Sequence, residues 1–75
     1  MNIDFEKKIG NNIRLIREKN GFTQEYVSTK LQLHGCDITR SALAKIEVGQ
    51  RHIYPDELYL LKTILKTNFE DIFKV

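Results

Sequence analysis

The chain has 75 residues, of which 41% are hydrophobic and 29% are charged, and its net charge is +2. This length allows one domain with a thin core, and the composition excludes a disordered tail. No apolar run approaches the ~18 residues that span a bilayer, and the N-terminus MNIDFEKKIG has no apolar signal-peptide core. The single cysteine excludes an internal disulfide. We therefore expect a cytoplasmic protein with one domain over residues 1–75.

The charges are unevenly distributed along the chain. Residues 1–52 carry nine Lys/Arg and six Asp/Glu, a net charge of +3, whereas residues 53–75 carry three and four, a net charge of −1. A mild basic bias suits an anionic partner, although a solvated surface gives the same pattern.

The first predicted helix covers residues 4–19. Its apolar side chains recur at spacings of four, four and three, which places them on one helical face. They are Phe5, Ile9, Ile13 and Ile16, with Leu15 widening the stripe. Asn2 or Asp4 can cap the start of this helix, and the Asn20-Gly21 pair predicts its end.

Two short helices are predicted between Thr23 and Gly49. Thr23 is a good N-cap for the earlier helix, which we expect to end at His34-Gly35. Thr39 is the expected N-cap of the later helix, and Gly49 is its stop. A polar break that contains a glycine therefore separates the two helices.

The remaining segments predict two further helices. Pro55 suits the first turn of a fourth helix, which carries a leucine-rich stripe and ends near Lys66. Asn68 is a good N-cap for a final short helix over residues 69–73. No segment alternates with period two over a useful length. The sequence therefore predicts an all-α fold, a compact bundle of five helices.

Several motifs occur together in a fixed order. The chain reads NIRLIREKNGFTQEYVSTKL, then ITRSALAKIEVGQR, ELYLLKTIL and FEDIF. This order resembles the lambda/Cro-type repressor family of helix-turn-helix proteins, from about Ile9 to Phe73. The most specific pieces are R-x-x-x-G-x-T-Q, from Arg17 to Gln24, and K-I-E-x-G, from Lys45 to Gly49. The resemblance implies a lambda-repressor-like bundle in which helices two and three form the helix-turn-helix.

One spacing departs from the family pattern. Thr23 and Glu47 are 24 residues apart, and roughly five residues, QLHGC, are additional to the family's usual separation. We therefore expect a lengthened turn between helices two and three. Either helix two gains a turn, or the loop bulges.

The resemblance implies that the start of helix three reads base edges in the major groove. The candidate base-reading residues are Thr39, Arg40, Ser41, Ala44 and Lys45. Arg40 can form two hydrogen bonds with guanine, and Lys45 can reach guanine or a phosphate. Ser41 discriminates less, and Ala44 can touch a thymine methyl group. The alternative is that these residues form a solvated helix face.

Four further residues are candidate phosphate contacts. Thr23 and Gln24 begin helix two, where backbone N–H groups can hold a phosphate. Ordinary helix capping is the alternative for both. Arg51 and His52 lie in the loop after helix three and can contact the DNA backbone, or they are simply solvated.

The resemblance also implies a structural ion pair between Arg17 and Glu47, which ties helix one to helix three. Each residue flanks an apolar stripe, so we expect the pair to be partly buried. Its expected role is structural and not DNA contact.

Catalytic residues are not evident. His34 and Cys36 form a His-x-Cys pair that lacks the further ligands of a metal site, and His52 is in a separate loop. No base is visible that would activate Cys36 as a nucleophile. We expect no enzyme activity, cofactor, metal or small-molecule substrate, and no membrane partner.

These features predict a sequence-specific regulator of transcription that binds double-stranded DNA. The expected form is a repressor that binds an inverted-repeat operator as a homodimer, although the family also includes activators. The alternative is a protein-interaction module, such as a DNA-binding antitoxin or an adaptor.

Overall fold

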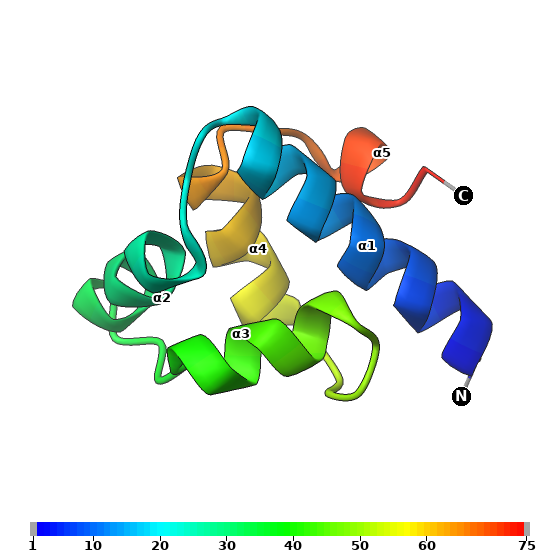
Figure 1. Ribbon diagram of the computed structural model, residues 1–75, viewed down its shortest axis with the longest axis horizontal. Helices are drawn as coiled ribbons and strands as arrows, with labels where there is room; N and C mark the ends of the chain where they lie inside the picture. Colours follow the sequence, from blue (N-terminus) through cyan, green and yellow to red (C-terminus); the bar gives the residue numbers. More distant parts are fainter. Residues whose placement is uncertain (1, 75) are drawn as a thin grey trace.

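Five helices build the structure, a computed structural model that describes residues 2–74 (Figure 1). In chain order they are α1 Ile3–Lys19, α2 Gln24–Leu33, α3 Arg40–Glu47, α4 Pro55–Ile64 and α5 Phe69–Ile72. The described residues contain no strand. The predicted all-α fold with five helices is therefore confirmed. The predicted bounds differ by one residue at the start of α1 and at the end of α5, and α4 ends at Ile64, two residues before the expected break near Lys66.

Side chains cap the starts of four helices. In each case the side-chain oxygen of the N-cap accepts a hydrogen bond from a backbone N–H three residues later. The N-caps are Asn2, Thr23, Thr39 and Asn68. In α4, Glu57 bonds the backbone N–H of Tyr54, and Pro55 occupies the first helical position.

The four longer helices end with the same hydrogen-bond pattern, the Schellman motif. At the end of α1, for example, the N–H of Phe22 bonds the carbonyl of Arg17, and the N–H of Gly21 bonds that of Glu18. The residue after the C-cap then takes a positive φ. It is glycine in α1, α2 and α3, but in α4 it is Lys66, with a φ of 55°.

The residues QLHGC lie at the end of α2 and in its connection to α3. Gln32 and Leu33 are the last two residues of α2, and His34 is its C-cap. The N–H groups of Gly35 and Cys36 then bond the carbonyls of Gln32 and Leu31, which closes the helix end. A lengthened turn relative to the family's usual spacing stays a prediction.

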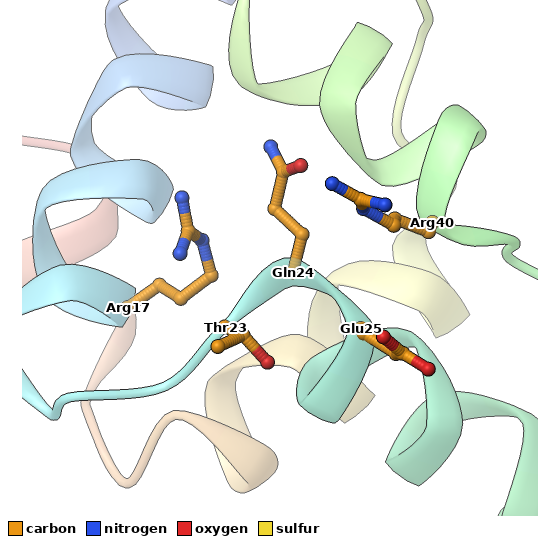
Figure 2. Close-up of a pocket in the computed structure, with 5 residues that line it drawn as sticks. All are labelled: Arg17, Thr23, Gln24, Glu25 and Arg40. Atoms are coloured by element: carbon orange, nitrogen blue, oxygen red, sulfur yellow. The ribbon is translucent and has the colours of Figure 1, made fainter.

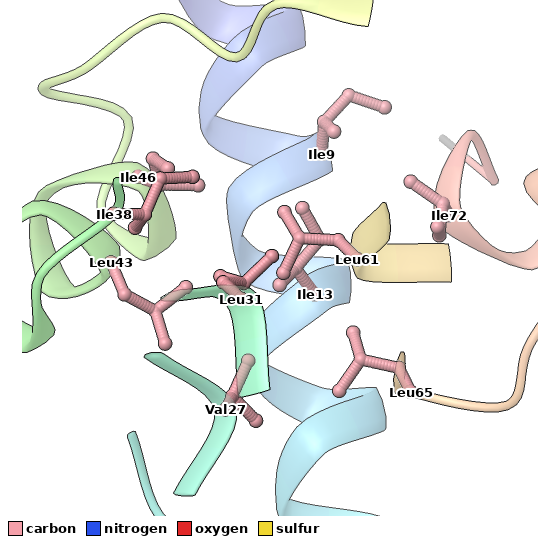
Figure 3. Close-up of a cluster of buried hydrophobic side chains, with 10 residues drawn as sticks. All are labelled: Ile9, Ile13, Val27, Leu31, Ile38, Leu43, Ile46, Leu61, Leu65 and Ile72. Atoms are coloured by element: carbon pink, nitrogen blue, oxygen red, sulfur yellow. The ribbon is translucent and has the colours of Figure 1, made fainter. Parts of the chain in front are cut away.

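The core lies where α1 packs on α3 and α5, and α2 packs on α3 and α4 (Figure 3). Its buried side chains are Ile9, Ile13, Val27, Leu31, Ile38, Leu43, Ile46, Leu61, Leu65 and Ile72. Each such side chain contributes roughly 1.5–3 kcal/mol when it leaves water. Two residues of the predicted α1 stripe lie outside this core, because Phe5 is 39% exposed and Leu15 is 48% exposed. Phe5 is near the N-terminal end of α1, where its ring stacks on Phe73.

Gly10 sets the approach of α1 to the end of α3. A Cβ atom at this position would overlap the carbonyl oxygen of Ile46 and contact the backbone of Glu47. The glycine therefore allows the two helices to cross in backbone contact. This crossing holds α3 against the bundle with its opposite face outward.

Candidate nucleic-acid interface

A buried carboxylate joins the first three helices. Glu47, at the end of α3, is 3% exposed and accepts from Arg17 of α1 at 2.7 Å and 3.1 Å. Its Oε1 also accepts from Nε2 of Gln24, the first residue of α2, at 2.9 Å. The third Arg17 bond, from Nη1, goes to the carbonyl of Phe22 at 2.8 Å. The network fixes the start of α2 relative to α3.

The ion pair is charged and well satisfied. Hydrogen bonding to Glu47 raises the pKa of Arg17 above its ordinary value, although burial acts in the opposite direction. A buried pair of this kind contributes little net stability when it is complete, but it is costly to break. The Arg17–Glu47 pair expected from the sequence is present in the structure, with two parallel hydrogen bonds.

The face of α3 opposite the core is polar and open. Arg40, Ser41 and Lys45 are exposed, and Ala44 is half-buried between them. The Oγ1 atom of Thr39 accepts from the N–H of Ala42, so this side chain serves as the helix cap. The buried residues on the other face are Leu43, Ile46 and Glu47. A basic, small-residue surface therefore lies along one helix.

Two adjoining pockets lie between the start of α2 and the open face of α3. One, of about 480 Å³, is lined by Arg17, Thr23, Gln24, Glu25 and Arg40 (Figure 2). The other, of about 430 Å³, is lined by Gln24, Arg40, Ser41 and Ala44. Gln24 and Arg40 are common to both pockets. The structure thus groups five of the predicted contact residues at one place, namely Thr23, Gln24, Arg40, Ser41 and Ala44.

The start of α2 also provides backbone donors. Thr23 accepts from the N–H of Tyr26 through Oγ1, at 3.0 Å. The N–H groups of Gln24 and Glu25 precede the first carbonyl-bonded turn, so the helix itself offers them no partner. They are available to an anion, and the carboxylate of Glu25 beside them opposes such binding.

The two basic residues of the loop after α3 are engaged with carboxylates. Arg51 donates from Nη1 and Nη2 to Glu57 at 2.9 Å and 3.0 Å, and Nη1 also reaches the carbonyl of His52. Nδ1 of His52 lies 3.0 Å from Oε1 of Glu6. The loop is thereby tied to α4 and to α1. Neither residue belongs to the two pockets between α2 and α3.

Sequence reasoning missed Glu57 and Glu6 as partners of this loop. For Glu57 a signal was present, since a Glu three residues after an N-cap commonly bonds back to the cap. For Glu6 no local pattern relates it to His52, which is 46 residues away. The sequence also contains no sign of the Gln24–Glu47 bond, because it indicates for Gln24 only a phosphate contact or helix capping.

Within the described residues 2–74, neither Cys36 nor the acidic side chains form a nucleophilic or metal-binding site. Cys36 is half-buried, and burial raises its pKa above the ordinary thiol value, which disfavours the reactive thiolate. Among residues 2–74, no group of three or more His, Cys, Asp or Glu is arranged to hold a metal ion. In the same range no helix is long and apolar enough to cross a membrane.

The fold and this surface define a helix-turn-helix protein, with α2 and α3 as the two helices of the motif. A family model described as helix-turn-helix matches residues 13–72, which is most of the chain. The chain belongs to this family of DNA-binding regulators, in its lambda/Cro-type form. Searches of curated proteins and of solved structures find no match.

Proposed function

We propose that the protein is a sequence-specific regulator of transcription that places α3 in the major groove of double-stranded DNA. The observation that carries the proposal is the open face of α3, where Arg40 and Lys45 are exposed while the opposite face is buried. A helix of this diameter fits the major groove, and residues at its N-terminal end reach base edges.

Each residue of this face has a role in the proposal. Arg40 bonds guanine through its two-pronged guanidinium, and Lys45 bonds guanine or a phosphate. Ala44 touches a thymine methyl group. Ser41 and Thr39 make weaker polar contacts at the helix start.

The phosphate contacts lie on either side of the reading helix. The N-terminus of α2, with Thr23 and Gln24, holds one phosphate through its free N–H groups. Arg51 and His52 contact the backbone from the loop after α3. The carboxylate of Glu57 offsets the positive charge of Arg51, and Glu6 occupies Nδ1 of His52, so we assign both residues a smaller contribution.

The regulator acts as a cytoplasmic homodimer that represses transcription from an inverted-repeat operator. The longest extent of one molecule is 30 Å, and half-sites one helical turn apart are separated by ~34 Å. Two copies in successive grooves, with their long axes along the DNA, are therefore separated by about 4 Å, a gap that side chains can bridge. Exposed aromatic side chains offer a contact surface, among them Tyr54, Tyr59 and Phe73.

The test starts with selection of bound sites from random duplexes, followed by binding titrations on the recovered site. The expected result is salt-dependent binding to a two-fold symmetric site, with affinity lost in the Arg40→Ala/Lys45→Ala double variant. The matched control is Lys62→Ala/Lys66→Ala, which also removes two cations but leaves α3 intact. Equal affinity of the native protein for every duplex would contradict the proposal.

The alternative function is a protein-interaction module, such as an antitoxin or an adaptor. The observation that favours it is a cluster of exposed rings, in which Phe5 stacks on Phe73 and Phe69 is tilted against Phe73. Under this alternative, substitution of Phe73 would abolish partner binding, and the α3 double variant would leave partner binding unchanged.

A further inference from the structure

Lys7 of α1 packs directly against the end of α3. Val48 is the C-cap of α3, and Gly49 follows it with a φ of 79°. A Cβ atom built on Gly49 would lie 2.5 Å from Cγ of Lys7 and 3.0 Å from its Cα. Because only glycine leaves this space, the backbone of α1 at Lys7 and the end of α3 are in close contact. This part of α1 is therefore held beside the segment that follows α3.

The Lys7 side chain extends from this contact into solvent. Its Cβ and Cγ atoms lie against Gly49, and the residue as a whole is exposed. A lysine that packs its methylene stem on a neighbour keeps its ammonium group in water. Figure 1 shows the N-terminal part of α1 beside the loop after α3, on the same lower side of the molecule as α3. A cation from α1 is thus available next to the proposed DNA-binding surface.

The two basic residues of the neighbouring loop already have carboxylate partners. Arg51 donates to Glu57, and His52 lies against Glu6, the residue before Lys7. In the described part of the chain, none of the ion pairs includes Lys7. A cation without a carboxylate partner attracts a phosphate more strongly than one whose charge is offset. Lys7 is therefore better suited than Arg51 to bind an anion on this side of α3.

We infer that the DNA contact surface extends onto α1, where Lys7 binds a phosphate of the DNA backbone next to the loop after α3. This inference rests on the proposed function. Thr23 and Gln24 share a pocket with Arg40 near the start of α3, whereas Lys7 lies at the end of α3. Backbone contacts near both ends of a helix fix its position along the groove without reading bases. Lys7 adds affinity and orientation, and base preference remains with α3.

The experiment compares two neighbouring lysines of α1 on the selected DNA site. Lys7→Gln removes the charge and keeps the stem that packs on Gly49. Lys8→Gln is the matched control, because Lys8 is also exposed but points about 100° away around the helix. We expect the slope of log K against log[salt] to become shallower by about 0.9 in Lys7→Gln and to stay unchanged in Lys8→Gln. The ratio of affinities for the selected duplex and for altered duplexes should be the same in both variants, because a phosphate contact carries no sequence information.

A second measurement locates the phosphate, with duplexes in which single phosphates are replaced by neutral methylphosphonates. One replacement should weaken binding by the native protein and by Lys8→Gln but have no further effect on Lys7→Gln, so that the two changes are non-additive. Thermal unfolding shows whether the variants are folded at the assay temperature, and Lys7→Met, which also keeps the stem, replaces Lys7→Gln if that variant is not.

The possible outcomes separate the inference from the proposed function. An unchanged salt slope in Lys7→Gln, or an equal change in both lysine variants, would overturn the inference. Additive effects of Lys7→Gln and every methylphosphonate would overturn it as well. Failure of the native protein to prefer any duplex would instead overturn the proposed function.

Discussion

The carboxylate of Glu47 accepts two hydrogen bonds from the guanidinium of Arg17, across a separation of 30 residues. Both side chains are buried, and Glu47 also accepts from Gln24. One ion pair therefore fixes α1, the start of α2 and the end of α3 together. The proposed DNA-binding surface depends on this geometry, although the pair lies beneath it.

Replacement of Arg17 by Met should destabilise the fold by about 3 kcal/mol, because it leaves the Glu47 carboxylate buried and without its countercharge. Urea unfolding of the two proteins measures the difference. The double variant Arg17→Met/Glu47→Met is the control, since it removes both charges together and should cost distinctly less. A loss below about 1 kcal/mol in the single variant would show that the pair is not effectively buried.

Replacement of Gly10 by Ala should destabilise the protein by about 1–3 kcal/mol, because the added Cβ overlaps the carbonyl of Ile46 and forces α1 away from α3. At a solvent-exposed helix position the same Gly-to-Ala change stabilises the folded protein by roughly 0.4–1 kcal/mol. The sign of the change in unfolding free energy, measured by urea unfolding, therefore shows whether the Cβ atom meets α3. Lys8→Ala, at an exposed position two residues away, should leave stability within about 0.5 kcal/mol.

Replacement of Lys66 by Gly should stabilise the protein by about 0.5–1 kcal/mol. Lys66 has a positive φ. In this conformation the Cβ atom of a residue lies too close to the carbonyl oxygen that follows it, and glycine avoids this contact because it has no Cβ. Thermal unfolding measures the effect. Lys66→Ala is the control, because it removes the charge and keeps the unfavourable conformation. Equal stability of the Gly and Ala variants would contradict this explanation.

The Arg51–Glu57 pair should make stability fall in acid. Hydrogen bonds from Arg51, and a further one from the backbone of Tyr54, lower the pKa of Glu57 below its ordinary value, about 4.3. The folded protein therefore binds fewer protons than the unfolded chain in this range. The contribution of the pair is present above pH ~4.3 and is lost as the pH falls through the lower, folded-state pKa. The Glu57→Gln variant should show a flatter dependence of unfolding free energy on pH between about 5 and 2, and an unchanged slope would argue against the pair.

Lys45→Ala should reduce the salt dependence of DNA binding. If Lys45 contacts a phosphate, its removal lowers the slope of log K against log[salt] by about one unit. If it bonds guanine instead, base preference changes at one position while the slope changes less. Lys62→Ala is the control, since the Lys62 ammonium lies over the rings of Tyr59 and Phe69 in a different part of the chain.

Local sequence signals predicted the helices well. The sequence predicts Thr23, Thr39 and Asn68 as N-caps, because Ser, Thr and Asn side chains accept hydrogen bonds from the free N–H groups of a helix start. Glycines after α1, α2 and α3 identified their ends. The end of α4 depended on the break in its apolar stripe, and nothing local indicated that Lys66 would take the conformation that glycine occupies elsewhere.

The site was less accessible to prediction. The helix period placed Arg40, Ser41, Ala44 and Lys45 on one face, and the structure shows that face to be open. The bonds that join distant residues could not be read from spacing. Gln24 to Glu47 and His52 to Glu6 arise from the packing of whole helices, and such contacts depend on interaxial angles that periodicity does not contain.

The shared ending of the four longer helices has a consequence for how the chain folds. Each of these ends is closed by hydrogen bonds within six consecutive residues, so a helix can stop at its native position before it docks on its neighbours. The starts are local too, because each capping bond spans three residues. When the starts and ends of the helices are determined locally, the unfolded chain samples fewer conformations before the helices dock. Helical domains rich in local contacts fold in roughly microseconds to milliseconds. We expect this protein to fold in that range, with the docking of preformed helices as the slow step.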